Sequence, residues 1–415
     1  MPRFSVRTKL AIIVFAVISA AAVGALVERP TDRPIPTMSL GDPDYLVFLA
    51  PPDALAEEFA PHGPASKRHV GFGITLYTLS TPIELMKSEL VAALDKAEAT
   101  RYPVLIQLDD WNYMFRSTDP EILEWTAFPE DGSEFGPVAT SRWIYTDEWT
   151  EIAPPPNYES PAFRAEVVRR LGTLGPIIAE RLAEWRKRGD THLLAGVVCG
   201  WKSGIYTLTE GALSRPAGSV APDETDTVRT GYAALSARGH DPESIGEAAR
   251  KYDRSEQEII DEILAGIVRD YTALFTRTLA ETGIPRERIY TNFTPWHSLP
   301  AEDIPHRLHG DGQVQPLWAS TNSFSRPGMV LANGSYHLDT LASDLATLGH
   351  EQWAATGVEL PADATSSGAA LAHLTGIYDK GAKLACLGDA VSPSATLVSL
   401  SDPRTVDAVQ QWLAE

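Results

Sequence analysis

Residues 103–111 read Pro103-Val-Leu-Ile-Gln-Leu-Asp-Asp-Trp111, an apolar run that ends in two carboxylates and an aromatic ring. Four other apolar runs also end in aromatic and polar residues: Leu193–Lys202, Arg288–Trp296, Val314–Asn322 and Gln352–Glu359. Short apolar runs between helical stretches are typical of buried parallel strands. In a barrel of such strands the carboxyl ends meet on one face, which carries the active site. The pattern therefore predicts an α/β fold, a (β/α)8 barrel with long β–α loops, over residues 43–415.

The stretches between these runs have helical periodicity. Ser160 precedes apolar residues at helical spacing, and the pattern stops at Arg186-Lys-Arg-Gly189, with basic residues and a glycine at the expected helix end. Another amphipathic helix is expected at Ser255–Thr282. The shorter helices are expected from a Thr81 cap to about Ala99 and at 338–348, 366–378 and 403–413. Further strands are expected at Leu384–Leu387 and at Tyr45–Ala50 or Val70–Tyr77.

Residues 112–160 have no convincing regular element, and residues 203–250 form another long connection. The first holds several large aromatic residues among acids and prolines. A long loop inside a compact domain is usually functional. These aromatics either form a binding surface or serve as a small core of the loop itself.

Composition limits the function classes. The chain has 415 residues, is 44% hydrophobic and carries a formal net charge of −20. This content is enough for a large folded core, and the negative charge disfavours nucleic acid as a partner. Neither a Gly-x-Ser-x-Gly nucleophile motif nor a glycine-rich phosphate loop occurs.

The N-terminal segment indicates export. Arg3, Arg7 and Lys9 precede an uncharged apolar run at residues 10–26. This order is typical of a signal peptide, and the run is only slightly short for a membrane span. We expect residues 1–27 to be either a signal peptide or an N-terminal membrane anchor, followed by a linker at 28–42. The body is then secreted or held at the outer face of the cytoplasmic membrane.

Cysteine and histidine usage gives no metal site. Cys199 and Cys386 lie in different predicted strands and are interpreted as buried thiols, although one bridge is compatible with their positions. His297, His306 and His309 share a proline-rich loop without helical spacing or a nearby acid pair. We expect no metal and no cofactor.

Aromatic and polar residues at the strand ends suggest carbohydrate as the ligand. Aromatic faces suit the C–H faces of sugar rings, and amides or carboxylates bind hydroxyls. The substrate-binding candidates are Trp111, Trp201, Lys202, Tyr206, Asn292, Trp296, Trp318 and Asn322. Packing at the barrel rim is the alternative role for each aromatic residue.

Glycoside cleavage usually needs two carboxyl groups. Glu359 ends the run at 352–359 and is predicted to be a nucleophile or base. Asp109 and Asp110 end the run at 103–111 and are the other catalytic candidates. Adjacent residues on a strand point to opposite sides, and both sides of this run are largely apolar, so the sequence leaves open which aspartate faces the axis.

The segment Gly200-Trp-Lys-Ser-Gly-Ile-Tyr206 follows the strand that is fourth in a simple count. In strand order the chain resembles glycoside hydrolases of the large (β/α)8 clan, which place a general acid/base Glu after strand four and a nucleophilic Glu after strand seven. Glu359 matches the late position. Trp201-Lys202 stands where the resemblance implies an acid, so the acid stays unassigned.

The residues together predict an exported glycoside hydrolase acting on an oligosaccharide or polysaccharide. The alternative is a non-catalytic glycan-binding barrel, which Lys202 favours. A surface scaffold that contacts proteins through residues 112–160 is a third possibility. Residues 10–26 would provide any membrane attachment.

Overall fold

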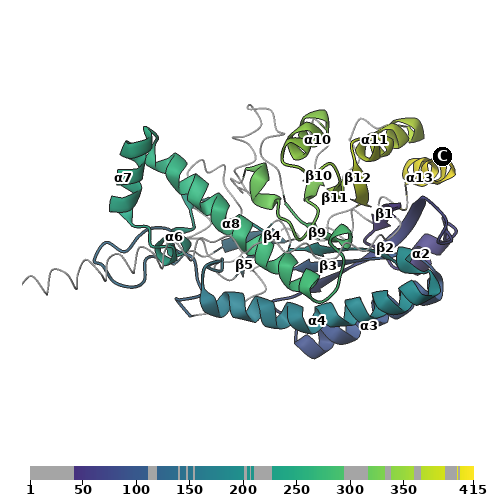
Figure 1. Ribbon diagram of the computed structural model, residues 1–415, viewed down its shortest axis with the longest axis horizontal. Coiled ribbons are helices and arrows are strands. Elements are labelled where there is room, and N and C mark those ends of the chain that lie inside the picture. The colour runs from purple at the N-terminus through teal and green to yellow at the C-terminus, as the bar shows by residue number, and fades with distance from the viewer. Residues whose placement is uncertain are drawn as a thin grey trace, which may run out of the picture. The chain divides into compact units, whose positions relative to one another are not determined.

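Eight parallel strands form the central sheet of the protein in this computed structural model (Figure 1). They are β1 (Asp44–Phe48), β2 (Arg68–Tyr77), β3 (Val104–Asp109), β6 (Leu194–Cys199), β9 (Ile289–Thr291), β10 (Gly328–Leu331), β11 (Trp353–Val358) and β12 (Ala382–Leu387). The structure describes residues 42–110, 119–138, 141–145, 148–152, 155–200, 203–205, 207–209, 227–293, 316–331, 338–358, 366–387, 400 and 402–415. All of them belong to one unit, residues 38–415.

The strands are hydrogen-bonded in the order β10-β11-β12-β1-β2-β3-β6-β9. Strands that are neighbours in this sheet are therefore also successive strands of the sheet along the chain, starting from β1. The two edge strands, β9 and β10, are bridged by backbone hydrogen bonds from Thr291 to Arg326 (3.1 Å), Phe293 to Gly328 (3.0 Å) and Val330 to Phe293 (2.8 Å). These bonds bring the edges together, and the predicted (β/α)8 barrel is confirmed.

Gly328 makes this seam possible. A Cβ atom at this position would lie 1.9 Å from the carbonyl oxygen of Thr291 and 2.7 Å from a methyl group of Thr356. Only a residue without a side chain lets the two backbones approach this closely. The seam therefore depends on one glycine at the start of β10.

The barrel interior is a layer of apolar side chains from six of its strands. Its members are Tyr45, Val47, Leu105, Ala195, Val198, Tyr290, Ala354, Leu384 and Cys386, with Leu49 packed against them. Alternate residues of a strand share a face, so this cluster indicates the internal side of β1 and β12, each of which contributes two residues that are two positions apart. Cys199 and Cys386 are buried and free, as expected.

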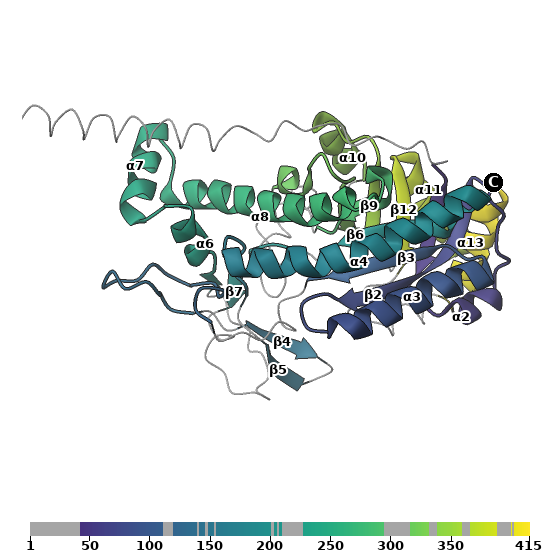
Figure 2. The ribbon, with the colours of Figure 1, turned by 60° about the horizontal axis from the view of Figure 1, so that its bottom comes forward.

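Helices connect the strands, and most of them pack around the barrel, whereas α6 and α7 contact α8 and lie beyond the barrel (Figures 1 and 2). They are α2 (Pro52–Ala56), α3 (Ile83–Thr100), α4 (Pro161–Arg188), α6 (Tyr232–Ala237), α7 (Pro242–Tyr252), α8 (Glu256–Glu281), α10 (Leu338–Thr347), α11 (Ser367–Asp379) and α13 (Pro403–Ala414). Single 3₁₀ turns are η2 (Thr191–Leu193), η3 (Arg286–Arg288) and η5 (Leu317–Ser320).

The two longest helices match their predictions. Ser160 caps α4 by accepting a hydrogen bond from the backbone N–H of Phe163, and Gly189 ends the helix at φ 78°. Ser255 and Glu258 form a reciprocal capping box at the start of α8. α4 packs beside both α3 and α8, and its Trp185 is fully buried.

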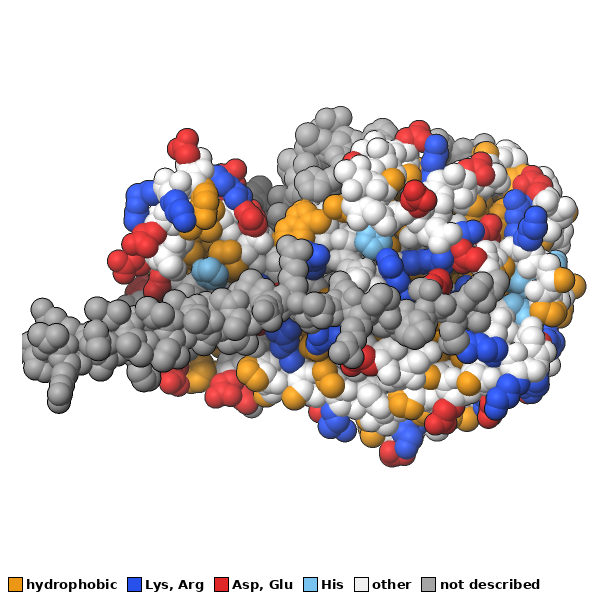
Figure 3. Space-filling model, viewed as in Figure 1, with side chains coloured by type: hydrophobic (Ala, Val, Ile, Leu, Met, Phe, Trp, Pro, Cys, Tyr) orange, Lys and Arg blue, Asp and Glu red, His pale blue; other side chains and the backbone are white. Residues whose placement is uncertain are grey.

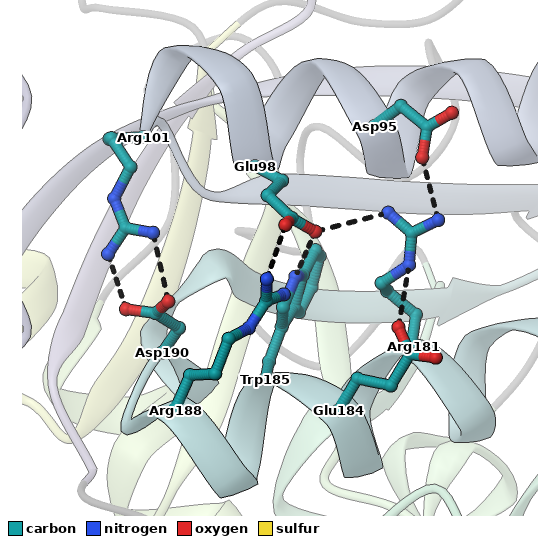
Figure 4. Close-up of polar contacts among 8 residues, drawn as sticks. All are labelled: Asp95, Glu98, Arg101, Arg181, Glu184, Trp185, Arg188 and Asp190. Carbon is teal, nitrogen blue, oxygen red and sulfur yellow. Dashed lines mark hydrogen bonds and ion pairs between the residues drawn. The ribbon is translucent and has the colours of Figure 1, made fainter.

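Ion pairs connect α3 and its C-cap Arg101 to α4 and to Asp190, two residues beyond the end of α4 (Figure 4). Glu98 of α3 accepts hydrogen bonds from Arg188 and from the indole N–H of Trp185 (3.1 Å), while Arg101 forms a bidentate pair with Asp190. The Arg188 and Trp185 bonds lower the pKa of Glu98 to about 2.

Three predictions of secondary structure were wrong. α3 has Pro82 at its N-cap and no side-chain cap, so Thr81 does not cap it. Residues 112–160, expected to lack regular structure, contain the hairpin of β4 (Ser141–Tyr145) and β5 (Glu148–Ile152). The long connection at 203–250 contains the hairpin of β7 (Thr207–Thr209) and β8 (Thr227–Arg229) and the helices α6 and α7. Each hairpin forms a two-stranded sheet of its own, and its short strands lack the long apolar runs that identify the strands of the barrel in the sequence.

The third error concerns the sixth strand of the barrel. The predicted run at Val314–Asn322 contains η5, which begins after Pro316 and is closed by a hydrogen bond from the Ser320 hydroxyl to Leu317 (2.7 Å). The strand is β10, only four residues long. Its partners across the seam are distant in sequence, so local pattern did not reveal it.

The visible face of the molecule carries acidic and basic side chains close to one another (Figure 3). Within the described ranges, no helix has the length and apolar character needed to span a bilayer. Residues 10–26 lie outside those ranges.

Candidate active site

Asp109 and Asp110 project from opposite sides of the end of β3. Asp109 shares its strand face with Leu105, a member of the interior cluster, and with Gln107. Asp110 follows Leu108 on the other side. Both aspartates are 4% exposed. The choice that the sequence left open is therefore resolved: Asp109 is on the interior face of the barrel.

The Asp110 carboxylate is held between the barrel and its helices. The Ser203 hydroxyl lies 3.0 and 2.9 Å from its two oxygens, and the Tyr271 hydroxyl of α8 donates to Oδ2 at 2.8 Å. The Tyr271 ring stacks on Tyr158 with centroids 4.0 Å apart. Burial, and then the charge of Asp110, raise the pKa of Tyr158 well above its ordinary value. Through these hydrogen bonds the Asp110 carboxylate connects the end of β3 to the turn after β6 and to α8.

Gly200 gives the chain the turn that this arrangement requires. It follows β6 at φ 79°, and a Cβ atom there would lie 2.0 Å from the Ser203 hydroxyl and 3.1 Å from Asp110 Oδ1. Its N–H donates to the carbonyl of Leu108 at 2.8 Å. Glycine therefore allows both the turn and the close approach of Ser203 to Asp110.

Asn292 joins three strand ends. It lies on the same face as Tyr290 of the interior cluster and is 4% exposed. Its amide nitrogen donates to the carbonyl of Gly200 (3.2 Å), and its amide oxygen accepts from the hydroxyl of Thr356 (2.9 Å). These bonds fix the ends of β6, β9 and β11 relative to one another. The β11 residue involved, Thr356, precedes Glu359 by three positions in the sequence.

Trp318 and Asn322 were predicted at a strand end, and that placement was wrong. Trp318 lies within η5, and Asn322 follows it. The amide oxygen of Asn322 accepts bonds from Thr276 of α8 (3.1 Å), from the N–H of Phe324 (2.9 Å) and from Ser325 (3.2 Å). Asn322 thus stabilises the turn that leads into the seam, while the substrate roles of the two residues stay predictions.

The other site candidates lie outside the described residues: Glu359, Trp111, Trp201, Lys202, Tyr206 and Trp296. The described strands that precede these residues in the sequence show which strand each residue follows. In barrel order β3 is third, β6 fourth, β9 fifth and β11 seventh, and β11 ends at Val358. Glu359 therefore follows the seventh strand in sequence, and Trp201-Lys202 follows the fourth after Gly200.

The groups that surround Asp110 were not predicted from the sequence. Ser203, Tyr158 and Tyr271 are distant in sequence from Asp110, and Tyr271 repeats the ordinary apolar period of α8. Their common signal is burial, which needs the fold.

Glu124 was also missed. It is 1% exposed and accepts a hydrogen bond from the N–H of Ala234 (3.2 Å) at the start of α6. Burial raises the pKa of Glu124 to about 8, although hydrogen bonds from backbone N–H groups act in the opposite direction and lower it. Glu124 thereby joins the loop after β3 to the loop after β6.

No cluster of three or more His, Cys, Asp or Glu side chains suited to a metal occurs in the part of the chain that the structure describes. The polar side chains near the described strand ends are hydroxyls, amides and carboxyls. Their chemistry is proton transfer and hydroxyl binding.

Two solved structures are distantly similar to this chain. No protein-family model and no curated protein matches the chain. A GH5-4 broad specificity endoglucanase from an uncultured bacterium is 10% identical, with 86% of this chain and 83% of that chain covered and a TM-score of 0.34. The exo-beta-1,4-mannosidase Op5Man5 from Opitutaceae bacterium strain TAV5 is 11% identical, with a TM-score of 0.36. The match covers 81% of this chain and 46% of that protein.

The barrel itself rests on the strand order and on the seam between β9 and β10.

Proposed function

We propose that this protein is a glycoside hydrolase that cleaves an oligosaccharide or polysaccharide at the carboxyl end of its barrel. The observation that carries the proposal is the placement of Asp109 at the end of the third strand, on the interior face. Glu359 directly follows the seventh strand in the sequence. In a barrel the two strand ends open onto the same face. The proposal is that this face receives one carboxyl group from each strand end.

The proposed reaction is acid-assisted cleavage of the glycosidic bond. Asp109 gives a proton to the glycosidic oxygen as its bond to the anomeric carbon breaks. Glu359 either attacks that carbon or removes a proton from the water that does so. A carboxyl separation of about 5–5.5 Å corresponds to the first course and retention, and about 6.5–9.5 Å to the second and inversion.

The substrate-binding part of the proposal uses the aromatic residues that follow the strands. Trp111, Trp201, Tyr206 and Trp296 would offer ring faces to the sugar. Lys202 would contact hydroxyls or hold a neighbouring carboxylate in its ionised form. Asn292 lies at this end of the barrel, and its hydrogen bonds to Gly200 and Thr356 keep it in place.

A non-catalytic glycan-binding barrel is the second candidate. Two observations favour it: the fourth strand is followed by Gly200-Trp201-Lys202, without an acid, and the Asp110 carboxylate is occupied by Ser203 and Tyr271. If Asp109 is not an acid, the described part of the barrel mouth offers no other carboxyl group on its interior face.

The test compares the full chain with Asp109→Asn, Glu359→Gln and Glu351→Gln. Glu351 is a matched control because it is exposed and precedes β11 at its opposite end. Product release is measured on a polysaccharide panel and on aryl glycosides, and calorimetry measures oligosaccharide binding. General acid catalysis contributes about 10²–10⁴-fold, so Asp109→Asn should lose about that much activity on natural glycans. It should lose much less on aryl glycosides, whose leaving groups need no proton.

Each outcome separates the candidates. Loss of activity in Glu359→Gln with retained binding supports the hydrolase. A wild-type protein that binds glycans but releases no product, with equal binding in all variants, establishes the non-catalytic barrel. Unchanged activity in a folded Glu359→Gln protein overturns the residue assignment.

We also propose that the barrel is exported, supported by the basic residues Arg3, Arg7 and Lys9 before the apolar run at 10–26. The run acts either as a cleaved signal or as an anchor. N-terminal sequencing of the protein from the cell envelope and the medium distinguishes the two.

A further inference from the structure

The backbone on either side of Asp109 is bonded to both neighbouring strands. The carbonyl of Leu108 accepts a hydrogen bond from the N–H of Gly200, which follows β6, at 2.8 Å. The carbonyl of Asp109 itself accepts two donors of Thr78, which follows β2: the N–H at 2.8 Å and the side-chain hydroxyl at 2.6 Å. The end of β3 is therefore held from both sides up to its last residue.

The Thr78 hydroxyl is more than the strand ladder needs. The N–H of Thr78 already satisfies the Asp109 carbonyl, as in any pair of parallel strands. The hydroxyl adds a second donor to the same oxygen, and Thr78 is 1% exposed, so bulk water has little access to this bond. Two donors on one carbonyl occupy both of its lone pairs and restrict the rotation of the peptide group between Asp109 and Asp110 more than one donor does.

Arg170 of α4 holds Thr78 in turn. Its Nη1 atom donates to the carbonyls of Thr78 (2.9 Å) and Thr81 (2.8 Å), at two points of the turn between β2 and α3. The Nε atom of the same guanidinium is bonded to Glu166, one turn earlier in α4, at 2.6 Å. These contacts tie the turn after β2, and through it the Asp109 carbonyl, to a helix outside the barrel.

Asp110 holds the other side of the same peptide group. Its buried carboxylate accepts the hydroxyls of Ser203 (2.9 Å) and Tyr271 (2.8 Å). A buried carboxylate is costly even when it is well bonded, and a neutral side chain could connect the same loops. Because Asp109 and Asp110 share one peptide group and their side chains point to opposite faces, holding the Asp110 side chain on its own face also keeps Asp109 on the interior face.

We propose that Thr78 and Asp110 are positioning residues for Asp109, a role that rests on the proposed function of Asp109 as the general acid. Thr78 fixes the carbonyl of Asp109, and Asp110 fixes the chain directly after it. Neither side chain touches the substrate. Proton transfer requires the donor within about 2.6–3.2 Å of the glycosidic oxygen, and a misplacement of about 1 Å can cost about 10²-fold in rate. The two residues supply this accuracy of placement.

The test measures kcat/KM of the full chain on the polysaccharide that the wild type cleaves fastest and on a nitrophenyl glycoside of the same sugar, whose leaving group needs no proton. Thr78→Val removes the hydroxyl and keeps the branched shape, whereas Thr78→Ser keeps the hydroxyl. Tyr271→Phe weakens the hold on Asp110 and keeps the ring. Thr347→Val is the matched control, because the Thr347 hydroxyl also donates to a backbone carbonyl, that of Ser343 (2.9 Å), but on the exposed surface of α10.

We expect Thr78→Val and Tyr271→Phe to lower kcat/KM on the polysaccharide by about 10–10²-fold and on the nitrophenyl glycoside by less than about twofold. Thr78→Ser should retain most of the activity, and Thr347→Val should match the wild type. A purely structural role would lower both activities together through the folded fraction, so equal losses on the two substrates overturn the proposal. A folded Thr78→Val or Tyr271→Phe protein with unchanged activity overturns the role of Thr78 or of Asp110, respectively.

Crystal structures of the wild type and of Thr78→Val distinguish a failure of this role from a failure of the proposed function. If the wild type cleaves no glycan, the proposed function fails, and the placement of Asp109 is judged from the two structures alone. An Asp109 carboxyl group at the same position in both overturns the positioning role, and one that is displaced by about 1 Å or adopts a second conformer supports it. Tyr271→Phe is compared in the same way and serves if Thr78→Val does not fold.

Discussion

The Tyr271 hydroxyl provides a direct test of the Asp110 network. Tyr271→Phe removes one hydroxyl and keeps the ring, so the stacking on Tyr158 at 4.0 Å and on Phe163 at 5.8 Å is retained. The variant loses the 2.8 Å hydrogen bond to a carboxylate that is 4% exposed. Hydrogen bonds to charged groups contribute about 1.5–3 kcal/mol. The free energy of unfolding should therefore fall by about 1.5–3 kcal/mol.

Urea denaturation followed by tryptophan fluorescence measures this change through the midpoint and slope. The matched control is Tyr252→Phe, because the Tyr252 side chain is 59% exposed and its ring, which contacts the Lys251 ammonium, is retained. Ser203→Ala and the double variant complete a cycle through Asp110, in which a coupling of about 0.5–3 kcal/mol is expected for groups that share one partner. A Tyr271→Phe protein as stable as Tyr252→Phe would refute a structural role for this network.

Two further predictions concern pH. Hydrogen bonds from Arg188 and Trp185 lower the pKa of Glu98 to about 2, so its contribution is complete above its ordinary pKa of 4.5 and disappears as the pH falls towards 2. Glu98→Gln should cost only about 0.5–1 kcal/mol at pH 7, since the side chain is 34% exposed, and nothing near pH 2, with exposed Glu89→Gln as the control. Burial raises the pKa of Glu124 to about 8, so the unfolded chain releases this proton first and stability should fall by a few kcal/mol as the pH rises from about 4.5 to 8. Glu124→Gln should flatten that decline in urea denaturation between pH 5 and 9, and exposed Glu130→Gln should not.

Local signals were sufficient for the long elements. α4 and α8 begin within one or two residues of their predicted starts, because capping residues and a 3.6-residue apolar period are properties of the segment itself. β10 was missed because its four residues form a strand only through neighbours elsewhere in the chain. The glycine that permits the seam, Gly328, is recognised only from the nearby Thr291 carbonyl.

The candidate site could be predicted only as a set of residue types at strand ends. β3 is buried on both faces, so its apolar pattern did not distinguish the inward from the outward aspartate. The feature that sets them apart, the Tyr271 hydroxyl, is 161 positions from Asp110. Asn322 was misplaced for the opposite reason: an apolar run with a polar end was interpreted as a strand, whereas the asparagine oxygen closes a turn.

The position of Asp110 makes the proposed chemistry more demanding. The Asp110 carboxylate is bonded to Ser203 and Tyr271, so Asp109 is the remaining acid of the pair. A general acid must be protonated when the substrate binds. A lysine close to it, such as Lys202 after the fourth strand, would lower its pKa and oppose that role. The same lysine close to Glu359 would keep the nucleophile ionised and assist it. Hydrolysis therefore requires the positive charge of Lys202 to act on Glu359 more strongly than on Asp109, and a barrel with the reverse arrangement would bind glycans without cleaving them.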